Sequence, residues 1–394
     1  MPLVEPIIGM EEYKVICTRG MNPVEITAEF TGEVRCPHCS GKRLRKKDSF
    51  WREIRHFCVG LKTTKIRIQT HKWRCRSCGR YFNTRLPGIL PYQQSSELFK
   101  DEVAVRHHEG YSKKRLSEAV KRAQSTVERY YQCYLKGRDR ETVDAYCPKV
   151  LGIDEKHFTK KLGFMTTFAD LRRRKVYDLA LGRSEKSLEG FVRKIPHKEN
   201  CRVVLMDLCE PFRQLVTKNF PNALIVADRF HVVKLVNHHF VKTWALLHEE
   251  GRRDRGLVSL MRRHEWNLRD EEQRARLRAY LRSHPGLEAI YDFKQKLMML
   301  LLKRVSTKTE ARPLVHEFTA AVRELKRSGF KPLETLGKTL QSWQKEIVRM
   351  WRFSRTNSIT EGLHNRMEEI LRRAYGMRNF ENFRIRVKIG RAHV

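Results

Sequence analysis

The hydrophobic pattern between residues 147 and 231 constrains the fold most strongly. Apolar stretches lie at 150–154, 164–171, 175–182, 202–207 and 223–231. Amphipathic segments separate the last three of them, at 184–195 and 210–221. Short apolar runs separated by turn residues predict strands, and the amphipathic segments predict helices. This order predicts a mixed sheet with helices packed on it.

Carboxylates close three of these apolar runs. The acids are Asp154, Asp207 and Asp228, and Glu361 lies near the start of a late amphipathic segment, "NSITEGLHNRMEEILRR". Two hard divalent cations require carboxylate oxygens that converge from rigid elements, so four acids are candidates for three places in a site for two Mg²⁺ or Mn²⁺ ions. The alternatives are a turn residue for Asp154 and a capping box, with Ser358 as N-cap, for Glu361.

Four cysteines in the N-terminal region, 1–92, form two C-x-x-C pairs, Cys36 with Cys39 and Cys75 with Cys78. Each pair lets two thiolates reach one metal ion, so together they predict one Zn²⁺ ion in a ribbon spanning residues 36 to 82. Four sulfur ligands leave no open coordination position, which makes the site structural rather than catalytic. Buried free thiols or redox pairs are the alternatives.

The segment between the two cysteine pairs is strand-like. In "TKIRIQTHKWRC" the apolar residues Ile66 and Ile68 alternate with basic residues, which predicts a hairpin leading into the second pair. Gly41 and Gly79 follow the two pairs, and we expect them to give the tight turns their backbone freedom.

A helical pattern follows in the segment 93–146. It divides at Gly110 and near residue 124, with Ser112 and Ser125 as possible N-caps of the second and third helices. Three short helices with tight turns predict a helix-turn-helix, in which the third helix would face DNA. The residues that we expect there are Gln124, Ser125, Thr126 and Arg129. A purely structural bundle is the alternative.

The sheet region at 147–231 is followed by a segment, 232–349, that is almost wholly helical in pattern. Its Leu-rich and Met-rich faces recur at helical spacing, so we interpret them as core and the segment as an inserted helical domain. The last segment, 350–394, supplies a final helix carrying Glu361 and a basic tail.

Charge indicates the partner. The 394 residues include 81 Lys and Arg against 45 Asp and Glu, a formal charge of +36 that favours a polyanion, and nucleic acid above all. No apolar run is long enough to span a membrane, and the N-terminus lacks the pattern of a signal peptide. We therefore expect a cytoplasmic, reducing compartment, in which cysteines are thiols or metal ligands.

The motifs taken in order resemble the DDE transposases of bacterial insertion sequences, specifically the ISL3-type family. The motifs are the two cysteine pairs, the helix-turn-helix pattern, "GIDEKHF", "VVLMD", "ADRFHVVK", the helical segment and "SITEGLHNRMEEILRRAYGMRNFENFR". The resemblance covers nearly the whole chain from Cys36 onward. It implies a multidomain α+β and α/β protein, with a zinc ribbon, a helix-turn-helix bundle and an RNase H-like mixed-sheet core interrupted by an all-helical insertion.

The same resemblance implies roles for individual residues. Asp154, Asp207 and Glu361 would bind two Mg²⁺ ions, while Asp228 and His231 would support the site from behind the ligands. In the family the second acidic ligand ends the fourth strand, which is predicted here as "VVLMD". If "ALIVAD" is the fourth strand instead, Asp228 becomes the second ligand in place of Asp207.

The activity implied by the resemblance is Mg²⁺-dependent cleavage at the ends of a mobile element, followed by strand transfer into target DNA. The ribbon and helix-turn-helix would bind the terminal inverted repeats, and a dimer or larger assembly on DNA, associated with the bacterial nucleoid, is expected. Two alternatives remain open. One is a zinc-ribbon DNA-binding regulator with an inactive core, and the other is a structure-specific nuclease without strand transfer.

Overall fold

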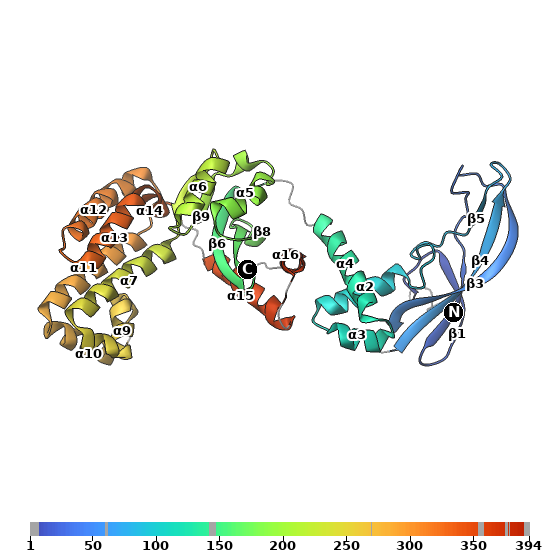
Figure 1. The fold of residues 1–394 in the computed structure, drawn as a ribbon, viewed down its shortest axis with the longest axis horizontal. Helices are drawn as coiled ribbons and strands as arrows, with labels where there is room; N and C mark the ends of the chain where they lie inside the picture. The colour runs from blue at the N-terminus through green and yellow to red at the C-terminus, as the bar shows by residue number, and fades with distance from the viewer. Residues whose placement is uncertain are drawn as a thin grey trace. The chain divides into compact units, whose positions relative to one another are not determined.

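The computed structural model describes residues 8–59, 62–141, 147–268, 270–353, 358–374, 377 and 379–389. The chain divides into two compact units, Met1–Glu141 and Thr142–Val394, each with a sheet and helices of its own (Figure 1). Among the helices that the structure describes, none is both long enough and apolar enough to cross a membrane.

The first unit contains a five-stranded sheet. Its order is β1-β2-β4-β3, and β5 also pairs with β4; the strands are β1 (Tyr13–Arg19), β2 (Val24–Phe30), β3 (Leu44–Val59), β4 (Lys62–Cys75) and β5 (Tyr81–Asn83). Strands β3 and β4 form the predicted hairpin, which carries the chain from the first cysteine pair to the second. Ile66 and Ile68 are fully buried, whereas Arg67 between them is exposed. The strands β1 and β2 were not predicted.

Three helices complete the first unit: α2 (Glu97–His108), α3 (Lys113–Val120) and α4 (Gln124–Glu141). Ser112 caps α3 as predicted, because its hydroxyl accepts a hydrogen bond from the amide of Arg115. Helix α4 begins at Gln124, so Ser125 lies inside its first turn and is not the cap that the sequence suggested. From the sheet, Arg55 donates hydrogen bonds to the carbonyls of Val120 and Lys121, which fixes the turn between α3 and α4.

The second unit contains the predicted mixed sheet. Its strands are β6 (Val150–Thr159), β7 (Gly163–Asp170), β8 (Lys175–Leu181), β9 (Val203–Met206) and β10 (Leu224–Ala227), in the order β10-β9-β6-β7-β8. The first three form an antiparallel meander, whereas β9 and β10 run parallel to β6. Helices α5 (Glu185–Arg193) and α6 (Glu210–Asn219) occupy the two predicted helical positions.

The register of this sheet brings distant carboxylates to one edge. Ile153 pairs with Met206, and Met206 pairs in turn with Ala227. Each of these three residues immediately precedes an aspartate, so three neighbouring parallel strands place an Asp at the same level. The carboxyl ends of parallel strands are where α/β proteins usually place their ligand sites.

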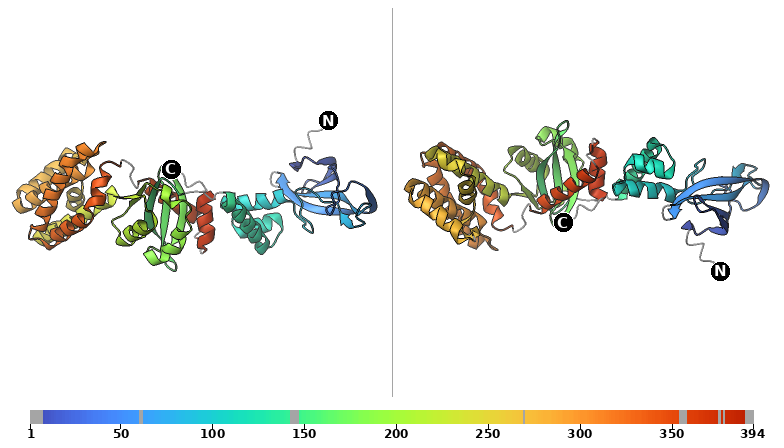
Figure 2. Two further views of the ribbon diagram at one scale, coloured as in Figure 1. Left: turned by 90° about the horizontal axis from the view of Figure 1, so that it is seen from above. Right: turned by 90° about the horizontal axis from the view of Figure 1, so that it is seen from below.

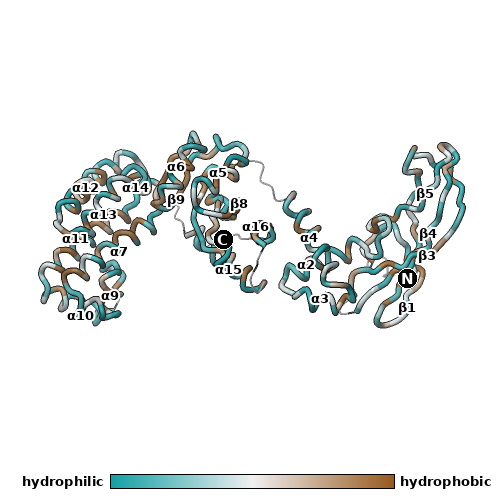
Figure 3. The backbone as a smooth tube through the Cα atoms, in the orientation of Figure 1, coloured by the Kyte–Doolittle hydropathy of each residue, from teal (hydrophilic) through white to brown (hydrophobic). Residues whose placement is uncertain are grey.

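Between β10 and the last helices the chain is helical, as predicted. The helices are α7 (Arg229–Leu247), α8 (Glu249–Arg253), α9 (Arg255–Arg262), α10 (Glu271–Arg282), α11 (Pro285–Leu302), α12 (Lys308–Lys326), α13 (Lys331–Ser342) and α14 (Gln344–Met350). Apolar residues recur along all of the longer ones (Figure 3). They form two cores. Trp244, Leu281 and Tyr291 belong to a small separate cluster, whereas Phe318 and Leu336 belong to the same core as the sheet.

Hydrogen bonds join the two ends of this insertion. The buried guanidinium of Arg229, the first residue of α7, donates to the carbonyls of Leu302, Lys303 and Met350, at the ends of α11 and α14. The indole of Trp351 donates to the carbonyl of Leu300. The insertion therefore leaves and re-enters the sheet unit at one fixed point.

Helix α15 (Ser358–Arg373) returns to the sheet and packs on β6, and α16 (Phe380–Ile389) packs on β8 (Figure 2). The contact with α15 depends on Gly152. A Cβ atom at that position would lie 2.9 Å from Cδ2 of Leu171 and 3.2 Å from Oγ1 of Thr360. Only a residue without a side chain lets α15 approach β6 this closely.

We expect Gly152→Val to lower the free energy of unfolding of the second unit by about 1–3 kcal/mol, the usual range for overpacking a core. The new side chain would force α15 away from β6. Chemical denaturation followed by fluorescence measures the change. Gly190→Ala is the control, since no atom lies within 4 Å of its added Cβ and alanine favours a helix. An equally stable Gly152→Val variant would contradict the packing argument.

Candidate active site

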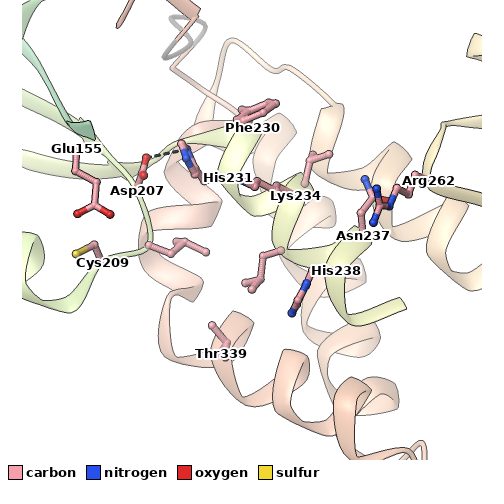
Figure 4. A pocket seen from close by; sticks show the side chains of 13 residues that line it. Glu155, Asp207, Cys209, Phe230, His231, Lys234, Asn237, His238, Arg262 and Thr339 are labelled. Atoms are coloured by element: carbon pink, nitrogen blue, oxygen red, sulfur yellow. Dashed lines mark ion pairs between the residues drawn. The ribbon is translucent and has the colours of Figure 1, made fainter. Parts of the chain in front are cut away.

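Two aspartates and a histidine converge at the edge of the second sheet. Asp154 lies inside β6, which continues five residues beyond the predicted strand end, and Asp207 directly follows β9. His231 lies in the first turn of α7. One ligand atom from each of these residues lies within 4.8 Å of the others. Figure 4 shows Asp207 and His231 facing each other.

His231 lies between two carboxylates. Its Nδ1 atom is 2.6 Å from Oδ2 of Asp228 and 2.7 Å from Oδ1 of Asp207. Only the Asp228 contact has hydrogen-bond geometry, and Oδ1 of Asp207 is a buried atom that accepts no hydrogen bond from the described residues. A buried carboxylate oxygen without a partner is unfavourable. This oxygen therefore fits a bound cation, for which a carboxylate is a preferred ligand.

Asp228 is fully engaged with protein groups. It is completely buried and caps α7, with Oδ1 accepting from the amide of Phe230 and Oδ2 accepting from His231. Asp228 therefore acts as a helix cap, and its contact with His231 is compatible with the supporting role that the resemblance implied. The free oxygen favours Asp207 over Asp228 as the metal ligand.

The electrostatics of the cluster are those of a site that lacks positive charge. Burial, and then the negative charge of Asp207, raise the pKa of Asp154 to about 7. Burial would lower the pKa of His231, but its contacts with Asp207 and Asp228 outweigh burial and raise that pKa to about 10. The Asp154 shift reflects burial first and negative charge second, whereas the His231 shift reflects the two carboxylates; a divalent cation would stabilise the ionised carboxylates.

Glu361 lies in the first turn of α15, exposed to solvent. It lines a cavity of about 650 Å³ together with Asp154, Asp228 and His231. It is not part of the tight cluster formed by Asp154, Asp207 and His231. The capping contact with Ser358 falls on a side chain outside the described part of the structure.

His364 was not identified from the sequence, although it follows Glu361 by one helical turn. Its Nε2 atom lies 2.9 Å from the hydroxyl of Thr167, and its Nδ1 atom lies 3.9 Å from Oδ2 of Asp154. Burial, and then the charge of Lys156, lower its pKa to about 4, so the ring is neutral near pH 7. The signal was the spacing of three residues, which places both side chains on one helix face.

A second cavity, of about 740 Å³, opens on the other side of the cluster. Asp207 lines it, and the insertion contributes Lys234, His238 and Arg262 (Figure 4). These cationic and polar groups are suited to phosphates. No residue of this cavity other than Asp207 and His231 was singled out from the sequence.

The residues predicted to face DNA lie at the start of α4. Gln124, Ser125 and Arg129 are exposed, and Thr126 is half-buried. The buried face of the same helix packs Val127 and Tyr130 against the rest of the three-helix cluster. Their exposure is compatible with the predicted role and does not test it.

The four predicted zinc ligands come together in the first unit. The sulfurs of Cys36 and Cys78 are 3.6 Å apart, as are those of Cys39 and Cys75. A tetrahedral site with Zn–S bonds of about 2.3 Å places its sulfurs about 3.8 Å apart, so the geometry fits zinc. A hydrogen bond from the backbone amide of Cys78 is the main cause that lowers the pKa of Cys75 to about 6, which favours the thiolate.

The turns around the sulfurs differ in one detail from the expectation. Gly79 has the left-handed backbone predicted for it, with φ of +74°, but in the first pair Ser40 takes this conformation, with φ of +56°. Gly41 is favoured for another reason, because a Cβ atom there would lie in tight contact with the sulfur of Cys39, at 3.3 Å.

Comparison with known proteins identifies the class. Residues 151–387 match the ISL3-type DDE family model described as "Transposase", so the chain belongs to this transposase family, as its motifs suggested. Residues 32–78 match the "zinc-finger of transposase IS204/IS1001/IS1096/IS1165", which spans all four cysteines.

A relative from Bordetella parapertussis is similar over most of its length. It is the "Transposase for insertion sequence element IS1001", 22% identical over 363 residues, which cover 90% of this chain and 87% of that protein. Transposition acts on DNA, so family membership implies a DNA partner, in agreement with the formal charge of +36. The four-cysteine cluster is a structural zinc site.

We expect one zinc ion per chain, and we expect Cys36→Ser to abolish its binding, because a serine hydroxyl is a poor zinc ligand. Elemental analysis after gel filtration measures the content. Cys133→Ser is the matched control, since Cys133 is an exposed free thiol on α4. A full zinc content in the Cys36→Ser variant would exclude the four-sulfur site.

The two aspartates around His231 should respond differently to replacement by asparagine. Asp207→Asn should weaken Mn²⁺ binding about tenfold or more and change stability little, since the lost ion pair with His231 is offset by the removal of a charge that repels Asp154. Asp228→Asn should lower the free energy of unfolding by about 1.5–3 kcal/mol, because it breaks a hydrogen bond to a charged partner. Titration calorimetry and denaturation measure the two effects. Loss of Mn²⁺ binding only in a fully stable Asp228→Asn variant would make Asp228 the ligand.

Proposed function

We propose that this transposase binds the terminal inverted repeats of an insertion sequence and catalyses Mg²⁺-dependent strand cleavage and strand transfer. Asp154, Asp207 and Glu361 would hold two Mg²⁺ ions. Two observations carry the proposal. A carboxylate oxygen of Asp207 lies within 4.8 Å of one of Asp154, and Oδ1 of Asp207 is buried and accepts no hydrogen bond from the described residues.

The strand order supports an RNase H-like core. Numbered along the chain, the five strands of the second unit lie in the order 3-2-1-4-5, with the first three antiparallel and the last two parallel to the first. The family resemblance implied an RNase H-like mixed-sheet core, with which this order agrees. In it, the first and fourth strands are neighbours, which brings Asp154 beside Asp207.

The chain's own residues would prepare the reaction. Two bound Mg²⁺ ions would supply an activated water and stabilise the departing 3′ oxygen of the cleaved phosphodiester. Asp228 fixes the imidazolium of His231, which in turn fixes the side chain of Asp207. The neutral ring of His364, hydrogen-bonded to Thr167, would hold Asp154 in place. The four groups together preorganise the carboxylates before DNA arrives.

The freed 3′ hydroxyl would attack target DNA in the second step. One phosphodiester bond forms as another breaks, so this step needs no external energy source and no covalent intermediate with the protein. Lys234 and Arg262 line the cavity beside Asp207 and would bind the phosphates of the DNA strand.

DNA recognition would fall to the first unit. The zinc ribbon and the helix-turn-helix would bind the terminal repeats mainly through phosphates, with base contacts from Gln124, Ser125, Thr126 and Arg129. Because two DNA ends must be joined to one target, a dimer or larger assembly on DNA is part of the proposal.

Glu361→Gln should abolish both reactions, lowering the cleavage rate by about a thousandfold or more, in line with the loss of a transition-state stabilising group. The assay uses labelled DNA carrying the terminal repeat of the element, with Mg²⁺. The matched control is Glu369→Gln, which changes an exposed glutamate on the same helix that pairs with Arg373.

Each outcome of this assay has a distinct meaning. Unchanged cleavage by the Glu361→Gln variant would remove Glu361 from the site. Cleavage by the unaltered protein without joining would identify a nuclease, and binding without cleavage would identify a DNA-binding regulator.

A further inference from the structure

Two large aromatic side chains line the same cavity as the carboxylates and remain exposed to water. Phe230 is 57% exposed and Trp266 is 54% exposed. Both line the cavity of about 650 Å³ that contains Asp154 and Glu361. Exposed rings at the wall of a catalytic cavity are unfavourable in water and suit a ligand with a flat apolar face.

Trp266 is supported on one face. Its ring stacks on the imidazole of His264, with centroids 3.6 Å apart and planes inclined by 20°. His264 is only 6% exposed, so it forms a fixed floor beneath the indole. His264 covers one face of the indole, so the exposed surface of Trp266 lies away from that face and is available for a second stacking partner.

Buried polar side chains hold the loop that carries Trp266. The ammonium group of Lys294 donates to the carbonyls of Met261 and Arg263 at the end of α9. The side-chain amide of Gln295 donates to the Arg263 carbonyl and accepts from the amide of Glu265. Lys294 and Gln295 are nearly fully buried on α11. The loop is thus fixed before any ligand binds.

Phe230 is fixed in a similar manner at the start of α7. Its neighbours Arg229 and His231 are both anchored, the first to backbone carbonyls and the second to aspartates. The Phe230 ring stands edge-on to His231, with centroids 5.4 Å apart. Phe230 and His231 line both cavities, so the phenyl ring stands where the aromatic cavity meets the basic one that contains Lys234 and Arg262 (Figure 4).

The two cavities differ in chemistry in a way that matches the parts of a nucleotide. The cavity of Lys234 and Arg262 offers cations, which suit phosphates. The cavity of Phe230 and Trp266 offers flat rings, which suit a base, and Arg304 lines its wall as a further cation. Its volume lies within the range of small-molecule sites, roughly 300–1,000 Å³.

We propose that Phe230 and Trp266 form a base-binding subsite, in which one unpaired nucleobase of the DNA end stacks beside the carboxylates while its strand lies in the basic cavity. The subsite rests on the proposed function, because the base must belong to the DNA that is cut. Stacking uses the π-face that every base has, so the subsite discriminates little between sequences. Its role is to hold the strand open and to position the phosphate next to the base.

The test compares cleavage of paired DNA with cleavage of DNA that is already unpaired. The substrates are a duplex carrying the terminal repeat and its flank, and the same duplex with a single mismatch at the cleavage junction. Trp266→Ala and Phe230→Ala should each cut the paired duplex about tenfold or more slowly, the loss expected for one aromatic stacking partner. The mismatch should restore most of that loss, because the base no longer has to leave a pair.

Three controls separate the subsite from a general structural defect. Trp266→Phe keeps a flat ring and should cut the paired duplex within about threefold of the unaltered chain, a smaller loss than full removal of the stacking ring. Leu246→Ala removes an exposed apolar side chain of α7 that lines neither cavity, and should have no effect. Binding of the duplex in the absence of Mg²⁺ should be similar for all variants.

The outcomes distinguish the subsite from the proposed function. If the unaltered chain cuts and both alanine variants cut paired DNA at the same rate, the subsite is wrong and the transposase mechanism stands. Equal slowing on paired and mismatched DNA would also exclude base binding. If the unaltered chain fails to cut either duplex, the proposed function fails and the subsite fails with it.

Discussion

Four consecutive residues at the junction of β10 and α7 hold the second unit together. Asp228 caps the helix and binds His231, while Arg229 ties the ends of two distant helices through their carbonyls. Phe230 faces the cavities, and His231 contacts Asp207 on the neighbouring strand. Because the first turn of a helix points successive side chains in different directions, one short segment connects sheet, insertion and site.

The charge balance of the site follows from this junction. Three aspartates leave adjacent parallel strands at one edge, and a single imidazolium offsets part of their charge. His231 has one Nδ1 proton for two nearby carboxylates, so Oδ1 of Asp207, although 2.7 Å from that nitrogen, accepts no hydrogen bond from the described residues. Such an arrangement is less favourable than a fully hydrogen-bonded one, which is consistent with the proposed binding of a cation there.

The sequence predicted those parts of the fold that depend on local patterns. The order of strands and helices between residues 150 and 227, the hairpin that carries Ile66, and the cap at Ser112 all follow from periodicity and short motifs. The sequence did not predict that β6 continues beyond Asp154 through "EKHFT". These residues are mostly polar, and the contacts that hold them in the strand come from distant parts of the chain. Thus Lys156 pairs with Glu368, 212 positions away.

The same limit applies to the site. The aspartates were found because each closes an apolar run, and Glu361 because of its motif. Trp266 gave no such local signal, and the only signal for His364 was its spacing of three residues from Glu361, since the roles of both depend on helices that meet in space. The proposed choice of Asp207 over Asp228 as ligand also rests on geometry, because each residue directly follows a strand and only their hydrogen-bond partners distinguish them.

The contact between Thr167 and His364 joins residues 197 positions apart, and the whole insertion lies between them. During synthesis, the strands of the sheet therefore leave the ribosome long before α15, and the surface around Gly152 and Leu171 stays uncovered in the meantime. Closing such a long loop is slow compared with forming local helices. The candidate active site is consequently one of the last parts of the chain to mature, so a partly made transposase holds its zinc ribbon and first three helices before that site is complete.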